Sequence, residues 1–588
     1  MNPSTATSVA LQCLYNEDIF RIILDSLDTS QRKSTLASLA RVCKPLHETS
    51  TAELWHSLDS FRPLLRLLPT DSWKEEPYMP GSSFIVLSII DPPPAEIDWT
   101  RFKHYARYVQ RLKWYLTQDF SLDSLDALLA RHPPTQPLLP QLRTLIWMEH
   151  NRDLFTLARF FLTPTLQRLR MNSFMVKRDD IPFLMNQVGE VCKNLEYLLL
   201  EISGLTDSCS EMLDTGTISH RRKVDPTDAV AGALSPLLHG LSKLQLYSGA
   251  YHMSAARTEA LAALPRLKKL ELDIKGDEMK TVAATALHRD PCAGPWFSAL
   301  KTLWFTVDKL DENTRVFLAA IQSSDLQLLV IKMDMQPETS MLQKHLAAIA
   351  RAPYRDSLTT LELFCDDQPG TERQLLLAGK ALQPLYALPR IHTVVFRNFV
   401  LAADPGTLCD IANAWPQLEV LALACIPVIE APLPVPRIGL ADLVPLALKC
   451  PRLRALDVEL WATEVPDEAA LAQLLPAPSQ STLQHLAVNF GPILDPPQVA
   501  DFLARVFPEL KHLMRIGPNG PTLPFPCGRR ELLPSAEWQT VGKLLAGRAS
   551  SASGTPLAEC DERSVIAIRE RDPFLVFDTC FDYHYWIM

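Results

Sequence analysis

The chain has 588 residues, of which 47% are hydrophobic and 21% are charged, and its formal net charge is −9. This composition indicates a folded protein in water, not a disordered one. The negative charge argues against general affinity for nucleic acids or acidic membranes, because both require clustered basic residues.

Targeting and membrane signals are not found. The N-terminus lacks a basic region followed by an apolar core, so no secretory signal is expected. The longest apolar run, Phe84–Ile90, is interrupted by Ser88 and is too short to span a bilayer. The twelve cysteines include no C-x-x-C pair, which favours reduced thiols and a location in the cytoplasm, the nucleus or both.

The first sixty residues predict a loose polar start, residues 1–10, followed by a bundle of three short helices in residues 11–60. Asn16 is the expected cap of the first helix. The polar stretch 29–35 is expected to link the first two helices, and the third is expected to begin near Ser50. So small a bundle is marginally stable by itself and gains from docking on a partner.

Residues 61–115 do not follow a regular pattern. They contain one short apolar strand, Phe84–Ile90, several prolines, and a helical pattern from Trp99 to Val109. We expect this segment to join the helical bundle to the following domain and to cap the exposed end of that domain.

Residues 116–520 are built from one repeated phrase, which is clearest in Leu267–Ile274 with the pattern L-x-x-L-x-L-x-I. The alternation of apolar and charged residues in this phrase is that of a strand with one buried face. Consecutive copies lie 24 to 35 residues apart, except for one step of 46 residues, a spacing typical of leucine-rich repeats. The phrase opens at Leu142, Leu166, Leu195, Leu241, Leu267, Leu300, Leu326, Leu358, Ile391, Leu418, Leu453, Leu483 and Leu510.

Helical patterns lie between the phrases. They cover Asp311–Ser323, Met341–Ala352, Gln374–Leu388, Leu440–Lys449, Asp467–Leu475 and Pro497–Phe507. Strand and helix alternating at this spacing predict an α/β solenoid of horseshoe form, with parallel strands on the concave side and helices on the convex side.

Two insertions and the C-terminus depart from the repeat. The longest step contains the polar, partly basic stretch 214–228, for which we expect a solvated loop and keep contact with a target as the alternative. A second insertion, Ile426–Arg437, holds four prolines. Residues 521–588 are expected to form a C-terminal cap or tail, with a helix from Ser535 to Leu545 and an aromatic end at Phe574–Met588.

The inner wall of the predicted horseshoe is the best candidate for binding. Residues between the buried leucines point to the concave face, and acids outnumber bases there. We therefore expect a partner protein with a basic surface and an apolar knob, although an ordinary solvated face stays the alternative for any single residue. The candidate target-binding residues are Tyr247, Glu271, Asp273, Trp304, Phe364, Arg397, Asp457 and Glu459.

Catalytic patterns are not found. The sequence contains no G-x-x-x-x-G-K-[ST] loop, no G-x-S-x-G elbow, no H-E-x-x-H and no G-x-G-x-x-G motif. His485 and His512 fall within predicted strands, and Cys192 and Cys450 just precede strand starts, positions typical of structural side chains. We therefore expect a protein that is not an enzyme and needs neither cofactor nor metal.

The N-terminal bundle carries a family resemblance. Leu14–Phe20, Leu36–Lys44 and Glu53–Trp55 resemble the F-box, in which an opening like L-P-x-E-I-L, a V-C middle and an L-W ending occur in this order. Tyr15 stands where the family usually has proline. With the segment up to Val109 and the repeats that follow, the chain is similar to fungal F-box proteins with leucine-rich repeats.

This resemblance implies a non-catalytic substrate receptor. An F-box binds a Skp-type adaptor and, through it, a cullin–RING ubiquitin ligase, while the repeats hold a target protein. The implied adaptor-binding residues are Leu14, Ile19, Ile22, Leu27, Leu39, Val42, Cys43, Leu54 and Trp55. The alternative function is a leucine-rich-repeat interaction scaffold without coupling to a ligase.

Overall fold

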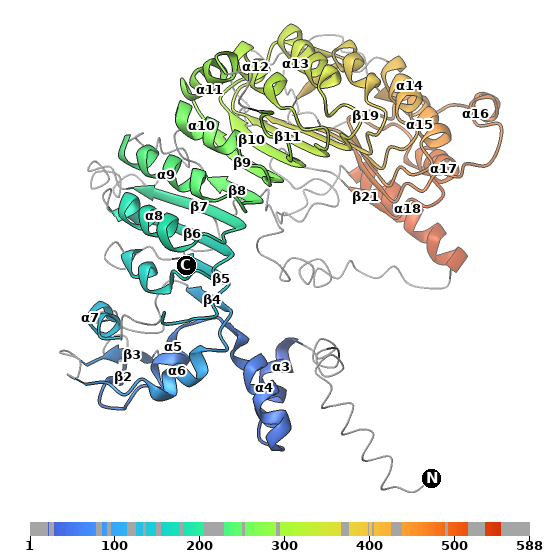
Figure 1. Ribbon diagram of the computed structural model, residues 1–588. Coiled ribbons are helices and arrows are strands. Elements are labelled where there is room, and N and C mark those ends of the chain that lie inside the picture. Colours follow the sequence, from blue (N-terminus) through green and yellow to red (C-terminus); the bar gives the residue numbers. More distant parts are fainter. Residues whose placement is uncertain are drawn as a thin grey trace, which may run out of the picture. The chain divides into compact units, whose positions relative to one another are not determined.

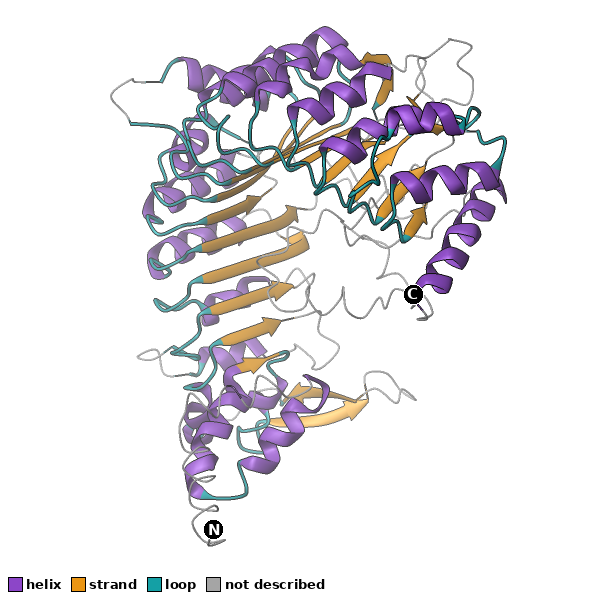
Figure 2. Cartoon of the chain, turned by 90° about the vertical axis from the view of Figure 1, so that its right-hand side faces the viewer, coloured by secondary structure: helices purple, strands orange, loops and turns teal. Residues whose placement is uncertain are grey.

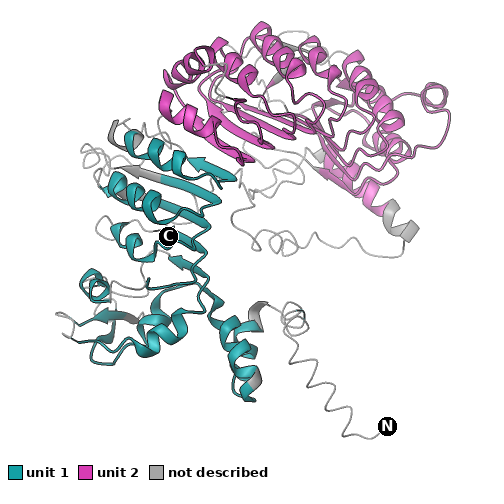
Figure 3. Cartoon of the chain, viewed as in Figure 1, with its two compact units in different colours: residues 1–251 teal, residues 252–588 magenta. Residues whose placement is uncertain are grey.

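The computed structural model describes residues 22, 29–77, 85–90, 96–114, 125–132, 137–148, 155–176, 180–204, 228–249, 253–289, 294–365, 376–397, 399–402, 405–424, 438–488, 492–514 and 536–553. The chain divides into two compact units, residues 1–251 and 252–588 (Figure 3). Residues 214–227 of the first insertion, the whole second insertion (426–437) and the aromatic C-terminal end lie outside the described residues.

The first unit begins with a helical pair, α3 (Thr29–Leu39) and α4 (Lys44–His56). The two helices pack through Leu36 and Leu46, which are 2% and 3% exposed. Two predicted boundaries are wrong. The expected link 29–35 forms the first turns of α3, and α4 continues through Ser50. A polar stretch does not stop a helix that buries only one narrow face, and Pro45 in the first turn of α4 sets its start.

The helical pair leads directly into the repeat sheet. β1 (Ser57–Leu58) follows α4 and pairs in parallel with β4 (Arg111–Trp114). Between them lie α5 (Arg62–Leu65), α6 (Thr100–Ala106) and an antiparallel hairpin of β2 (Trp73–Pro77) and β3 (Ile85–Ile89), which confirms the short apolar strand predicted there.

Six parallel strands form the sheet of the first unit, in the order β1, β4, β5, β6, β7, β8, counting described residues only. The further elements are α7 (Leu125–Ala130), β5 (Thr144–Met148), the 3-10 helix η1 (Phe155–Phe161), β6 (Arg168–Val176), α8 (Asp180–Val191), β7 (Tyr197–Gly204), α9 (Asp228–Gly240) and β8 (Leu246–Gly249). An aromatic core supports the first strands, in which Trp114 stacks on Trp147 at 4.4 Å between ring centroids and Phe161 lies beside both rings.

The second unit continues the same architecture with nine parallel strands, again among the described residues, in the order β9, β10, β11, β12, β14, β16, β18, β20, β21. These strands are β9 (Lys269–Ile274), β10 (Thr302–Val307), β11 (Leu328–Met333), β12 (Thr360–Cys365), β14 (Thr393–Arg397), β16 (Val420–Ala424), β18 (Ala455–Val458), β20 (His485–Val488) and β21 (His512–Met514).

Helices cover one face of the sheet in each unit (Figures 1 and 2). Those of the second unit are α10 (Ala255–Ala262), α11 (Glu278–Leu287), α12 (Glu312–Ala320), α13 (Thr339–Arg351), η4 (Gly379–Ala387), α14 (Pro405–Ala414), η5 (Ala441–Leu443), α15 (Val444–Lys449), α16 (Glu468–Leu474), α17 (Pro496–Val506) and α18 (Ala536–Ser553). Several begin at a side-chain cap, such as Asp311, whose carboxylate accepts hydrogen bonds from the backbone N–H groups of Asn313 and Thr314.

One predicted helix, Gln374–Leu388, is wrong. Its described part begins with a short strand, β13 (Leu376–Ala378), which pairs with β15 (Val400–Ala402), and continues as the 3-10 helix η4. Pro384 lacks the N–H of a regular α-helix, and a Cβ at Gly379 would lie only 2.2 Å from the Thr407 hydroxyl oxygen. A similar short pair, β17 (Ile438–Gly439) and β19 (Leu460–Trp461), lies farther along the chain.

The leucine phrases form the predicted ladder. In twelve of the thirteen copies, a strand begins two residues after the opening leucine or isoleucine. The core-facing residues of β9 to β12 occupy every second position and are at most 2% exposed, as in Leu270, Leu303, Leu329 and Leu361. Buried hydroxyls link successive repeats; for example, the Ser323 Oγ donates to the Leu300 carbonyl at 2.7 Å. The fold is therefore an α/β leucine-rich-repeat solenoid.

The exceptional copy shows an error in the predicted reading frame. The Gln245 N–H donates to the Glu196 carbonyl, just as the Glu196 N–H donates to the Gln167 carbonyl one repeat earlier. The phrase therefore opens at Leu244, not at Leu241. Tyr247 takes the place of the second buried leucine, and its register partner on β7 is Leu198.

Candidate protein-binding surfaces

We call the sheet face opposite the helices the inner wall. It carries most of the predicted target-binding residues. In the second unit, register places Glu271, Trp304 and Val330 side by side on β9, β10 and β11. A second row contains Asp273, Thr306 and Lys332. Trp304 is only partly buried and lies between an acidic and an apolar neighbour.

A group of charges ends this part of the wall. The Lys275 Nζ lies 2.9 Å from an Asp334 carboxylate oxygen, 3.5 Å from one of Asp273 and 4.0 Å from one of Asp308. Burial raises the pKa of Asp273, and the charge of Lys275 opposes that shift. Three carboxylates around one ammonium leave a local excess of negative charge at this end of the wall.

Farther along, the inner wall is more deeply covered. The Arg397 guanidinium lies 4.9 Å from the centre of the Phe364 ring, and both side chains are partly exposed. Glu362 is 6% exposed, and burial raises the pKa of its carboxyl while the charge of Arg397 opposes the shift. Asp457 also attracts Arg397. Ala422, which is in register with Val395 and Asp457, gives β16 a small residue on the inner wall.

Two expected wall residues are inaccessible. Tyr247 is 0% exposed because it occupies a core position of its repeat, as the corrected frame requires. Asp457 is on the inner-wall row, in register with Ala422 and Ala487, but it is only 1% exposed. Alternation assigns a side chain to a face and cannot tell whether that face is covered. Glu459 lies between β18 and β19 and is partly exposed.

The predicted adaptor-binding residues divide into exposed and internal ones. Ile22 and Val42 are 69% and 67% exposed. Leu39, Cys43 and Leu54 instead pack against the buried core of the helical pair. The Trp55 ring lies 4.7 Å from that of Tyr105 on α6, so it also joins α4 to the following segment. Leu14, Ile19 and Leu27 lie outside the described residues.

The first unit has a basic inner wall that the sequence analysis missed. Arg111 and Lys113 on β4 and Arg168 and Arg170 on β6 flank β5, and the exposed Arg143 directly precedes β5. We call these five residues the basic wall. Val109, Leu112 and Trp114 form a further copy of the phrase. This copy places Arg111 and Lys113 on the same sheet face as Arg168 and Arg170.

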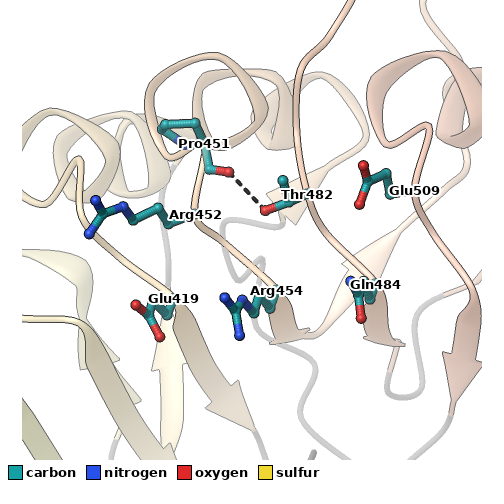
Figure 4. Close-up of a pocket in the computed structure, with 7 residues that line it drawn as sticks. All are labelled: Glu419, Pro451, Arg452, Arg454, Thr482, Gln484 and Glu509. Atoms are coloured by element: carbon teal, nitrogen blue, oxygen red, sulfur yellow. Dashed lines mark hydrogen bonds between the residues drawn. The ribbon is translucent and has the colours of Figure 1, made fainter.

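A shallow hollow of about 590 Å³ lies where β18 and β20 begin (Figure 4). It is lined by Glu419, Pro451, Arg452, Arg454, Thr482, Gln484 and Glu509. The Thr482 hydroxyl donates to the Pro451 carbonyl at 2.8 Å and thereby ties two successive repeats. The two arginines and two glutamates balance in charge, so the hollow has no net preference for an anion or a cation.

Metal-ligating side chains are not gathered in the described part of the chain. Described His, Cys, Asp and Glu side chains form no cluster of three or more that could hold a metal ion. Burial raises the pKa of Cys192 to about 12 and that of Cys450 to about 11, which keeps both thiols protonated. The rings of His485 and His512 stack 4.8 Å apart, and burial lowers the pKa of His485. Within the described residues, no helix is both long and apolar enough to cross a membrane.

Comparisons with known proteins give similarity of structure only. No family model matches the chain, and no curated protein matches it. A chain of the Rad7 and Elc1 complex in yeast is 14% identical, with 71% of this chain and 88% of that chain covered and a TM-score of 0.33. A leucine-rich-repeat protein of Leptospira interrogans is 13% identical, with coverages of 70% and 91% and a TM-score of 0.32. The leucine-rich-repeat-containing protein LegL7 from Legionella pneumophila is 12% identical, with coverages of 71% and 93% and a TM-score of 0.28. Identities and TM-scores this low carry no conclusion about what this chain binds.

Proposed function

We propose that this chain is the substrate receptor of a Skp–cullin–F-box type ubiquitin ligase. Its N-terminal helices bind a Skp-type adaptor, and its inner wall holds the protein to be ubiquitylated. The contribution of the chain is then effective concentration and orientation, not covalent chemistry. Such a role belongs in the cytoplasm or the nucleus.

The observation that carries the adaptor part is the exposure of apolar side chains on a very small bundle. Val42 and Ile22 are more than two-thirds exposed, whereas Leu36 and Leu46 fill the small core between α3 and α4. Exposed apolar groups on a marginally stable bundle favour docking on a partner. Their burial in the interface stabilises both the complex and the folded bundle. The direct passage from α4 into β1 supports the same role, since a bound adaptor is then held close to the ladder.

The target part rests on the accessible section of the inner wall. Glu271, Asp273 and Trp304 offer acidic groups beside a large aromatic ring on β9 and β10, and Phe364 with Arg397 adds a second aromatic position. Trp and Arg are common anchors of protein interfaces. In a pull-down with the full chain, a Trp304→Ala/Phe364→Ala variant should capture less protein than the unmodified chain. A Phe183→Ala variant is the control and should capture the same amount, because Phe183 is 47% exposed on helix α8, away from the inner wall.

The adaptor test is co-purification of the full chain with a purified Skp-type adaptor. Val42→Asp should reduce the recovered adaptor about tenfold or more, because a charge would be buried in the contact. Leu494→Asp is the matched control, since Leu494 is 74% exposed in the second unit. Leu54 and Trp55 are unsuitable for this test, because both already make internal contacts. Recovery that is absent with the unmodified chain, or equally reduced by both changes, refutes the adaptor role.

A scaffold without ligase coupling is the second candidate. The packing of Trp55 on Tyr105 and of Leu54 on the helical core favours it, because these residues then serve to close the end of the ladder. Retained target capture without adaptor binding would identify this function.

A further inference from the structure

The basic wall of the first unit differs in charge from the rest of the molecule. The whole chain has a net charge of −9. The five basic residues nevertheless lie together on, or just before, the three neighbouring strands β4, β5 and β6: Arg111, Lys113, Arg143, Arg168 and Arg170. In register, Arg111, Thr144 and Arg168 form one row, and Lys113, Ile146 and Arg170 form the next. The row residues other than Ile146 are partly exposed, and Arg143 is exposed.

Lys113 and Arg170 each have an acidic neighbour among the described residues. The Lys113 Nζ lies 3.4 Å from an Asp59 carboxylate oxygen, and an Arg170 guanidinium nitrogen lies 3.3 Å from one of Glu201. The side chain of Arg111 makes no hydrogen bond or ion pair with a described residue, and its Nε is buried. The Arg168 guanidinium lies 4.6 Å from the centre of the Tyr197 ring, which orients it by a cation–π contact.

The spacing of these groups determines what ligand fits. Arg111 and Arg168 are two strands apart, or about 10 Å at the usual spacing between strands. In a peptide with the polyproline II conformation, which has three residues per turn and rises about 3.1 Å per residue, side chains three residues apart point the same way and are separated by about 9 Å. A peptide crossing β4, β5 and β6 with acidic residues at positions i and i+3 would therefore meet both guanidinium groups, with Arg143 beside the middle of the peptide.

We propose that the basic wall binds an acidic, Asp- or Glu-rich segment of the partner protein. The inference rests on the proposed capture of a protein by the inner wall, and it names the chemistry recognised in the first unit. Guanidinium groups pair with carboxylates through two parallel hydrogen bonds, which gives both orientation and strength. Separation of the arginines by about 10 Å favours separate carboxylates over one phosphate group, which requires converging donors. Nucleic acid fits less well, because the described wall offers no free aromatic platform for bases.

The test uses fluorescein-labelled poly-L-glutamate and the full chain, with binding followed by fluorescence anisotropy at low salt. The whole chain repels this probe, so binding reports a local basic surface. Arg111→Glu/Arg168→Glu should weaken binding about tenfold or more. Arg111→Lys/Arg168→Lys keeps the charge but loses the paired hydrogen bonds, so it should retain only part of the binding. The matched control is Arg452→Glu/Arg454→Glu, which makes the same charge change at exposed arginines of the second unit.

The outcomes separate this inference from the proposed function. Loss in the wall variant alone supports the acidic-segment site, provided that the circular dichroism spectrum is unchanged; Arg111→Gln/Arg168→Gln gives the same test with less perturbation. Equal loss in the control variant, no binding of poly-L-glutamate, or preference for poly-uridylate or a poly-phosphoserine peptide would each overturn it. Co-purification with the adaptor is measured on the same variants. If these variants still bind the adaptor but poly-L-glutamate does not bind, the acidic-segment site is refuted and the proposed receptor function is not.

Discussion

Leu303 and Trp304 are neighbours in β10 that test the division between core and inner wall. Leu303 is 0% exposed and lies in register between Leu270 and Leu329. Its replacement by alanine removes a buried side chain from a ladder that cannot readily collapse, at a cost of about 3 kcal/mol. Trp304 projects from the other face and is partly exposed, so its replacement by alanine should cost about 1 kcal/mol or less.

Hydrogen exchange measured by mass spectrometry gives the local effect. A loss of about 3 kcal/mol corresponds to roughly 150-fold faster exchange of the β9–β11 amides, whereas about 1 kcal/mol corresponds to roughly fivefold. Local exchange is the appropriate readout because a solenoid need not unfold in a single step. Equal acceleration by the two substitutions, or a greater effect of Trp304→Ala, would refute the assigned faces of the strand.

Three further changes test specific interactions in the second unit. Ser323→Ala removes the buried donor to the Leu300 carbonyl and should cost about 1–2 kcal/mol in urea denaturation; an unchanged midpoint would show that this link between repeats is dispensable. Asp311→Ala removes the cap of α12 and should cost about 1 kcal/mol, with Asp311→Asn retaining most of the stability. Glu362→Gln should gain stability relative to the unmodified chain as pH rises. Burial raises the folded pKa of Glu362, so the folded state holds the proton more tightly and loses stability as pH rises from the unfolded pKa through the folded one. A stability difference independent of pH would contradict the burial of an ionisable Glu362.

The periodic part of the fold could be predicted from sequence because the same pattern of apolar residues recurs in every repeat. Leucines such as Leu267, Leu300 and Leu326 open phrases whose strands begin two residues later, and the buried faces follow from alternation. The position of Tyr247 could not be predicted in this way, because the phrase could open at either Leu241 or Leu244. The backbone hydrogen bonds between repeats show that it opens at Leu244.

Irregular and terminal elements were less predictable. Val109, Leu112 and Trp114 form the first full copy of the phrase, but valine and tryptophan replace leucine there and hide the repeat. The Gln374–Leu388 pattern has helical spacing, yet pairing of β13 with β15 and the presence of Pro384 give a different structure. Tertiary contacts override a local pattern in such segments.

The candidate binding residues could be predicted only in part. Sequence alternation assigned Glu271, Asp273 and Trp304 to the inner wall, where the structure has them partly exposed. It could not show that Asp457 is covered, because burial depends on residues distant in sequence. The basic wall was missed for a related reason: its charges come from β4 and β6, and only register brings them together.

Chemical cross-linking of the full chain to a purified Skp-type adaptor tests the central claim most directly. Lys33 on α3 and Lys44 at the start of α4 are exposed and suitable for an amine-reactive cross-linker. The proposed receptor role predicts that cross-links to the adaptor concentrate on these two lysines and disappear with Val42→Asp. Cross-links confined to lysines of the second unit, such as Lys280 on α11, or no complex at all, would contradict it.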